Sequence, residues 1–216
     1  MRAVLLMFLL LASPAQAGPW PREKGHVFLS VGGVSEIDQT TGTIATFSTL
    51  YGEYGITEKI TFGVDLGSDG RRSSKAVIFL RHPLTDAAKE IKLAAEIGLG
   101  FVNGDKALRP GLSIGRGYTL GKRNGWMTAD SRVVIFEGIS NIQFESDLTI
   151  GLSASKRLKL ILQLQTGIPA HDTSYIRLAP SVVFERKPGR HTEFGVTAGI
   201  KGVSGLGLKI GSWFEF

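Results

Sequence analysis

The C-terminal stretch from Ser204 to Phe216 alternates between apolar residues and small or charged ones. Successive side chains of a strand point to opposite faces. One face of an extended strand here would carry Leu206, Leu208, Ile210, Phe214 and Phe216, and the other Gly207, Lys209, Gly211, Trp213 and Glu215. An apolar edge strand that runs to the last residue invites aggregation in a soluble domain. A transmembrane β-barrel accommodates such a strand, because lipid surrounds a polar lumen. The stretch therefore favours a membrane barrel over the alternative, a soluble sandwich.

The first seventeen residues have the pattern of a secretory signal peptide. Arg2 precedes an apolar run over residues 3–12, and Ser13-Pro-Ala-Gln-Ala17 has the small residues of a cleavage site. The apolar run is shorter than the ~20 residues that a transmembrane helix needs. We expect cleavage near Ala17, a signal peptide at 1–17 and one barrel domain at 18–216. The expected location is the bacterial outer membrane.

Composition agrees with an exported barrel that lacks disulfides. The chain has 28 glycines and no cysteine. Curved barrel strands with crowded inner walls need glycine, which otherwise weakens a strand. The net charge of +6 comes from scattered basic residues with no patch that interleaves with aromatics, so nucleic acid is not expected as a partner.

Period-2 segments bounded by turn residues predict an all-β fold, a single antiparallel closed transmembrane β-barrel of about twelve strands. Each segment is near the length of a tilted spanning strand. An even number of strands would place both termini on the periplasmic side. The expected strands lie near 26–35, 45–54, 59–67, 75–82, 90–102, 110–120, 126–137, 142–154, 158–166, 174–185, 192–200 and 205–216.

Two of these segments have a weak alternation. Arg81 and His82 are adjacent, and Arg116 shares a predicted face with Leu112 and Ile114. An arginine at the bilayer midplane costs about 2–4 kcal/mol and much less near the interface. We expect either a bulge in these strands or a position at the rim for these residues.

The inward faces hold the candidate functional residues, because no other set of polar residues falls on one side of the predicted wall. Charges of both signs in a confined lumen are expected to pair. They either brace and fill the interior or line a narrow polar pore whose acidic excess favours cations or polar neutral solutes. The predicted lumen-lining residues are Glu53, Asp65, Glu96, Asp130, Arg132, Glu145, Asp147, Lys159, Arg177, Glu193, Lys209 and Glu215.

Two stretches resemble a known family. Residues 19–30 (PWPREKGHVFLS) and 50–65 (LYGEYGITEKITFGVD) are similar to outer-membrane proteins of the meta-pathway of phenol degradation. The resemblance covers roughly the first fifty residues after the signal peptide. It implies an outer-membrane barrel and the passage of small apolar or aromatic solutes, and it brings no site residues.

The ends and loops suggest further partners. Trp213, Phe214 and Phe216 resemble the C-terminal signal that the barrel assembly machinery recognises. Outer-membrane lipid would surround the barrel, and Arg71, Arg72 and Lys75 could bind lipopolysaccharide phosphates on an outer loop.

No constellation in the sequence predicts catalysis, a metal site or a cofactor. The four histidines, His26, His82, His171 and His191, lack metal-ligand spacing. His171, Asp172 and Ser174 hold the residue types of a hydrolytic triad, but neighbours in sequence seldom converge as a triad requires.

We therefore predict that the protein is not an enzyme. We expect a narrow passive channel or a weakly selective transporter for small solutes. A filled structural or adhesive barrel without a pore and an outer-membrane hydrolase remain as alternatives.

Overall fold

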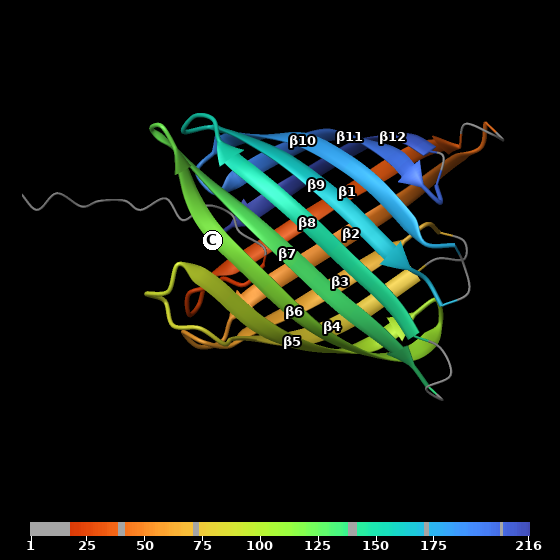
Figure 1. Cartoon of the computed structure of the whole chain (residues 1–216), viewed down its shortest axis with the longest axis horizontal. Coiled ribbons are helices and arrows are strands. Elements are labelled where there is room, and N and C mark those ends of the chain that lie inside the picture. Colours follow the sequence, from red (N-terminus) through yellow and green to blue (C-terminus); the bar gives the residue numbers. More distant parts are fainter. Residues whose placement is uncertain (1–17, 39–41, 71–73, 138–141, 171–172, 204) are drawn as a thin grey trace, which may run out of the picture.

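A closed antiparallel barrel of twelve strands makes up the computed structural model, which describes residues 18–38, 42–70, 74–137, 142–170, 173–203 and 205–216 (Figure 1). The predicted signal peptide at 1–17 lies outside the described residues. Every strand pairs with its sequence neighbours, and β1 pairs with β12. The strands are β1 (Val27–Asp38), β2 (Ile44–Gly55), β3 (Thr61–Ser68), β4 (Ser74–Pro83), β5 (Ile91–Val102), β6 (Asp105–Leu120), β7 (Arg123–Phe136), β8 (Ile142–Ser153), β9 (Leu158–Ile168), β10 (Tyr175–Lys187), β11 (Arg190–Lys201) and β12 (Gly205–Glu215). The predicted fold and strand number are confirmed.

Closure of the sheet depends on the seam between β1 and β12. Their antiparallel register runs from Phe28 opposite Glu215 to Asp38 opposite Gly205. Beyond the strand end, the Val27 amide donates to the Phe216 carbonyl at 2.7 Å, and the Phe216 amide donates back at 3.1 Å. Both termini therefore lie at the same end of the barrel, on the left in Figure 1, which we call the terminal end. The opposite end is the far end.

Three connections are shorter than predicted because two-residue turns close them. In each case the residues that flank the turn pair directly with each other. The turns are Asn103-Gly104, Gly121-Lys122 and Pro188-Gly189. Asn103 and Gly104 have φ of 54° and 91°, as a type I′ hairpin turn requires. As a result β6 begins at Asp105, five residues before its predicted start.

The large apolar side chains face outward. Each of the twelve strands contributes at least one exposed Val, Ile, Leu, Met or Phe, and Leu208 and Ile210 on β12 are 70% and 57% exposed. Such continuous apolar surface is far larger than a soluble monomer exposes. It is the surface that surrounding lipid covers in a membrane barrel. In the described part of the chain no helix is long and apolar enough to cross a membrane.

The two weak segments are regular strands. Arg81 faces the interior and is 2% exposed, while His82 faces outward at the end of β4. Arg116 faces outward on β6 and pairs with Glu90 of the neighbouring turn at 2.9 Å, near the terminal end. The rim position expected for Arg116 is correct. For Arg81 the expected bulge and the expected rim position were both wrong, because its side chain points into the lumen from a regular strand.

Inward aromatic rings lie over glycines of the neighbouring strand. Phe79 lies over Gly63 and Trp126 over Gly151, each directly opposite its glycine in the register. A Cβ added at Gly151 would come within 2.2 Å of the Trp126 ring, so only glycine leaves room for the indole. A third pair of this kind joins Tyr175 and Gly167. The abundance of glycine thus reflects the space that aromatic side chains take inside a narrow barrel.

Replacing Gly151 should therefore destabilise the barrel. We expect Gly151→Ala to lower the free energy of unfolding by about 1–3 kcal/mol, the usual cost of overpacking. Gly117→Ala on β6 is the matched control, because its Cβ would meet a single atom, 3.9 Å away. Urea unfolding of the folded protein in detergent measures both variants, and equal losses would contradict the packing explanation.

Candidate functional site

Residues 18–25, which we call the N-terminal segment, cross the lumen at the terminal end. Near β1, the Gly25 amide donates to the Gly55 carbonyl, and the Arg22 amide donates to the Thr61 hydroxyl at 3.0 Å. Further toward the N-terminus, Pro19 and Trp20 lie against Gly115 of β6, where an added Cβ would come within 2.8 Å of both. Gly18 reaches Thr128 and Asp130 of β7.

This path spans the barrel because β7 lies six strands from β1 in a ring of twelve. Gly18 and Pro19 are buried although they precede the first strand. The N-terminal segment therefore narrows the lumen at one end. No strand pattern predicts this segment, and the signal for it in the sequence is Pro19-Trp20-Pro21, a stiff apolar stretch that a solvated segment would not need.

A network of buried ion pairs joins strands β2 to β6 on the inner wall. Arg81 on β4 donates to Glu53 at 2.5 Å and to Glu96 at 2.8 Å. Arg109 on β6 donates to Asp65 at 2.6 Å and to Glu96 at 3.2 Å. We call these residues, with Lys75, which lies 2.8 Å from Asp65, the lumen network.

The centre of the lumen network is buried, and the network continues to both sides. The side chains of Arg81, Glu53 and Glu96 are 3% exposed or less. Arg22 of the N-terminal segment reaches the second oxygen of Glu53 at 2.5 Å, which ties the segment to the network. On the other side Arg132 lies 3.5 Å from Glu96 and 3.8 Å from Asp147.

Aromatic rings line the same wall. The Tyr51 hydroxyl donates to Glu53 at 2.6 Å, and its ring stacks on Phe79 with centroids 5.8 Å apart. The Arg81 and Arg109 guanidiniums lie 5.2 Å and 5.8 Å from the Phe79 ring centroid, within cation–π range. These contacts partly replace the water that the buried guanidiniums give up.

The opposite wall carries two separate ion pairs. Lys209 on β12 lies 2.8 Å from Glu193 on β11, which also accepts a hydrogen bond from Ser181 at 2.7 Å. Nearer the far end, Arg177 on β10 donates to Glu36 on β1 at 2.9 Å. The carboxylate of Glu36 accepts a further bond from Thr197.

The other predicted lumen residues also lie at inward positions of their strands. Asp130 accepts a 2.6 Å hydrogen bond from Ser113, and Glu145 accepts one from Gln143, also at 2.6 Å. Lys159 and Glu215 lie near the terminal end on β9 and β12. Of the proposed assembly signal, Trp213 packs edge-on against Phe28, while Phe214 and Phe216 face outward.

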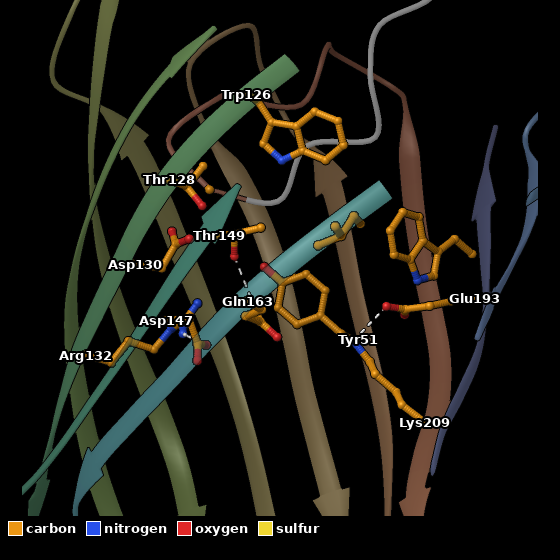
Figure 2. Close-up of a pocket in the computed structure, with 13 residues that line it drawn as sticks. Tyr51, Trp126, Thr128, Asp130, Arg132, Asp147, Thr149, Gln163, Glu193 and Lys209 are labelled. Carbon is orange, nitrogen blue, oxygen red and sulfur yellow. Dashed lines mark hydrogen bonds and ion pairs between the residues drawn. The ribbon is translucent and has the colours of Figure 1, made fainter. Parts of the chain in front are cut away.

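Two cavities lie within the barrel. The inner cavity, of about 200 Å³, is bordered by Gly18 and by aromatic and charged side chains from both walls. Figure 2 shows Tyr51 projecting between Gln163 on one side and the Glu193–Lys209 pair on the other. The second cavity, of about 830 Å³, lies at the far end and is lined by Lys75, Glu145 and Tyr175 among others. We call it the vestibule.

The charge balance of the interior differs from the prediction. The predicted set held eight acids and four bases, but the inner wall also includes Arg22, Lys75, Arg81 and Arg109. With Glu36 these described residues comprise nine acids and eight bases, so the acidic excess among them is one charge and not the four of the predicted set. Lys75, expected to bind lipopolysaccharide, instead pairs with Asp65 inside the barrel, and Arg71 and Arg72 lie outside the described residues.

Of the candidate hydrolytic triad, only Ser174 lies within the described residues. His171 and Asp172 lie outside the described residues. His26, His82 and His191 lie on β11 or at the ends of other strands, and no three His, Cys, Asp or Glu residues in the described part of the chain could hold a metal ion.

We predict that the lumen network is the main internal brace of the barrel. Arg81→Met should lower the free energy of unfolding by about 3–5 kcal/mol, because it leaves two buried carboxylates without their shared partner. Lys106→Met is the control, because its pair with Glu137 is exposed and should contribute less than about 1 kcal/mol. Urea titration followed by tryptophan fluorescence measures both, and an Arg81→Met loss no larger than the control would refute the prediction.

Comparison with known proteins identifies the fold and not a family. No family model matches the chain, and no curated protein is similar to it in sequence, so membership in the phenol-degradation family is not confirmed. The solved structures that resemble it include the KdgM porin, with 8% identity, coverage of 87% of this chain and 99% of that one, and a TM-score of 0.64.

Two other similar structures are also channels or outer-membrane proteins. The COG4313 outer-membrane channel from Pseudomonas putida F1 has 10% identity, coverage of 93% and 99%, and a TM-score of 0.55. The outer-membrane protein Omp33 of Acinetobacter baumannii has 10% identity, coverage of 88% and 99%, and a TM-score of 0.53. At such low identity the likeness establishes the architecture alone. The chain thus has the fold of bacterial outer-membrane barrels, among them porins and channels.

Proposed function

We propose that this protein is a narrow passive channel for small polar solutes in the bacterial outer membrane. The observation that carries the proposal is the reversal of polarity across the wall. Apolar side chains cover the outside, and charged and hydroxyl side chains surround two cavities inside. A barrel filled with apolar side chains would not need a charged inner surface. Passage of water-soluble molecules through the barrel does need a polar lumen.

The solute class follows from the near balance of inner charges. Paired acids and bases on both walls cancel most of the long-range potential, so neither ion sign gains a large advantage. Aromatic faces next to carboxylates and amides around the inner cavity suit small solutes that carry hydroxyl or amide groups. A KdgM porin has been solved in complex with disordered oligogalacturonate, so a barrel of this fold accommodates a polar saccharide.

The apolar or aromatic solutes implied by the resemblance fit this interior less well. Buried ionic groups would have to lose their remaining water to an apolar solute without a compensating hydrogen bond. We therefore propose polar solutes in place of apolar ones.

Planar-bilayer recording tests the proposal. We expect a small ohmic conductance and a reversal potential close to zero in a KCl gradient. Lys209→Gln should shift the reversal potential towards cation selectivity, and Asp147→Asn towards anion selectivity, because each removes one charge from the inner cavity. Lys89→Gln on an exposed turn is the control and should change neither quantity. Absence of conductance, together with no solute entry in liposome swelling, would reject the channel.

The second candidate is a filled structural barrel, and the N-terminal segment specifically favours it. Pro19 and Trp20 lie inside the terminal end against Gly115 of β6, where they narrow the lumen. Deleting Pro19 to Pro21 draws Gly18 back by up to about 10 Å, three residues of extended chain. If the wild type conducts, the deletion should raise its conductance several-fold. If only the deletion variant conducts, the native protein is a closed barrel, and the second candidate replaces the first.

A further inference from the structure

Asp130 is a buried carboxylate without a direct ion pair among the described residues, although the charge of Arg132, two residues further along β7, acts on it. It is 8% exposed, and its one hydrogen bond comes from the neutral hydroxyl of Ser113. No Lys, Arg or His in the described part of the chain lies within 4.0 Å of it. The other carboxylates that are this deeply buried in the lumen, Glu53, Asp65, Glu96 and Glu193, each have a basic partner. An unpaired buried charge is costly, so Asp130 needs an explanation.

The backbone of Gly18 lies beside this carboxylate. A Cβ added at Gly18 would lie 3.6 Å from Oδ1 of Asp130 and 3.0 Å from the methyl group of Thr128. The Gly18 nitrogen is attached to the same Cα, about 2.5 Å from that Cβ position. The Gly18 nitrogen therefore lies at most about 6 Å from Oδ1 of Asp130. Both groups border the inner cavity.

Gly18 is also the residue that follows the predicted cleavage site, Ser13-Pro-Ala-Gln-Ala17. Hydrolysis of the bond between Ala17 and Gly18 adds water across the amide, leaves a carboxylate on the released peptide and converts the Gly18 nitrogen into a primary amine. This amine is protonated at neutral pH, because an α-amino group has a pKa of about 7.7–8.0.

We propose that Asp130 forms the binding site for the α-ammonium group of the processed chain itself. Removal of the signal peptide creates a cation beside the one deeply buried lumen carboxylate that has no direct ion pair among the described residues. The ion pair fastens the free end of the N-terminal segment to β7, and Arg22 with Glu53 fastens its other end near β2. The segment is thus held across the lumen at both ends. Before cleavage the Gly18 nitrogen is a neutral amide, so only the mature protein has this second attachment.

The expected result is a protected amine whose protection depends on Asp130. The mature protein, extracted from outer membranes in detergent, should begin at Gly18 by N-terminal sequencing and intact mass. Acetylation with an activated ester from pH 6.5 to 9, followed by peptide mapping, measures the reactivity of the Gly18 amine. At pH 8 it should react at least about tenfold more slowly than in the unfolded chain, because an adjacent carboxylate favours the protonated, unreactive form.

Matched variants separate the ion pair from simple burial. Asp130→Asn keeps the size of the side chain and should return the midpoint of the pH–reactivity curve to the ordinary range for an α-amino group. Asp147→Asn, which removes the carboxylate directly opposite Asp130 in the register, should shift that midpoint less than Asp130→Asn does. Insertion of one serine between Ala17 and Gly18 moves the amine by up to about 3.8 Å and should also abolish the shift.

Three results would overturn the proposal: a mature chain that begins elsewhere, a wild-type midpoint equal to that of the unfolded chain, or an Asp130→Asn midpoint equal to wild type. If Asp130→Asn does not fold, the serine insertion decides alone. None of these readouts requires conductance, so failure of this site and failure of the proposed channel are distinguishable.

Discussion

Hydrogen bonding between the first and last strands is the constraint on which the rest of the structure depends. In a bilayer, a strand edge without a partner leaves amides and carbonyls that no water can satisfy. The eleven residue pairs between β1 and β12 remove that edge and turn a twelve-stranded sheet into a cylinder. Once the sheet is closed, alternate side chains must face either lipid or the lumen. The apolar outside and the charged inside are both consequences of closure.

Charged side chains inside a narrow barrel have to pair with side chains of opposite charge. Arg81 and Arg109 do so by sharing Glu96 and by each holding one further carboxylate, which links the strands from β2 to β6. The N-terminal segment joins this network through Arg22 and then crosses to β7. Arg22 therefore links the network that braces the barrel to the segment that narrows its lumen. The remaining space is divided between an inner cavity and a wider vestibule at the far end.

Much of the fold could be predicted from local pattern, and the pairing inside the lumen could not. Period-2 alternation in segments such as Thr61–Ser68 reports which face of the strand each residue occupies, and it gave the strand number correctly. Arg81 was misjudged because its neighbour His82 breaks the polarity of the outer face at the end of β4. Asn103-Gly104 is a signal for a two-residue hairpin turn, whereas the predicted strands left a longer connection between residues 102 and 110. The position of the N-terminal segment could not be predicted, because it contacts Gly115 and Asp130, which lie about a hundred residues away in sequence. Local sequence patterns do not report such distant contacts.

The most direct test of this account is the electrophoretic mobility of the protein extracted from the outer-membrane fraction, compared before and after boiling in detergent. A closed barrel with a continuous hydrogen-bonded wall and a buried ionic interior resists unfolding by detergent at room temperature. We therefore expect a fast-migrating band that on boiling converts to a slower band at the mass of the chain without residues 1–17. A single band with unchanged mobility, in protein released with the periplasmic fraction, would contradict the closed membrane barrel and the channel proposed from it.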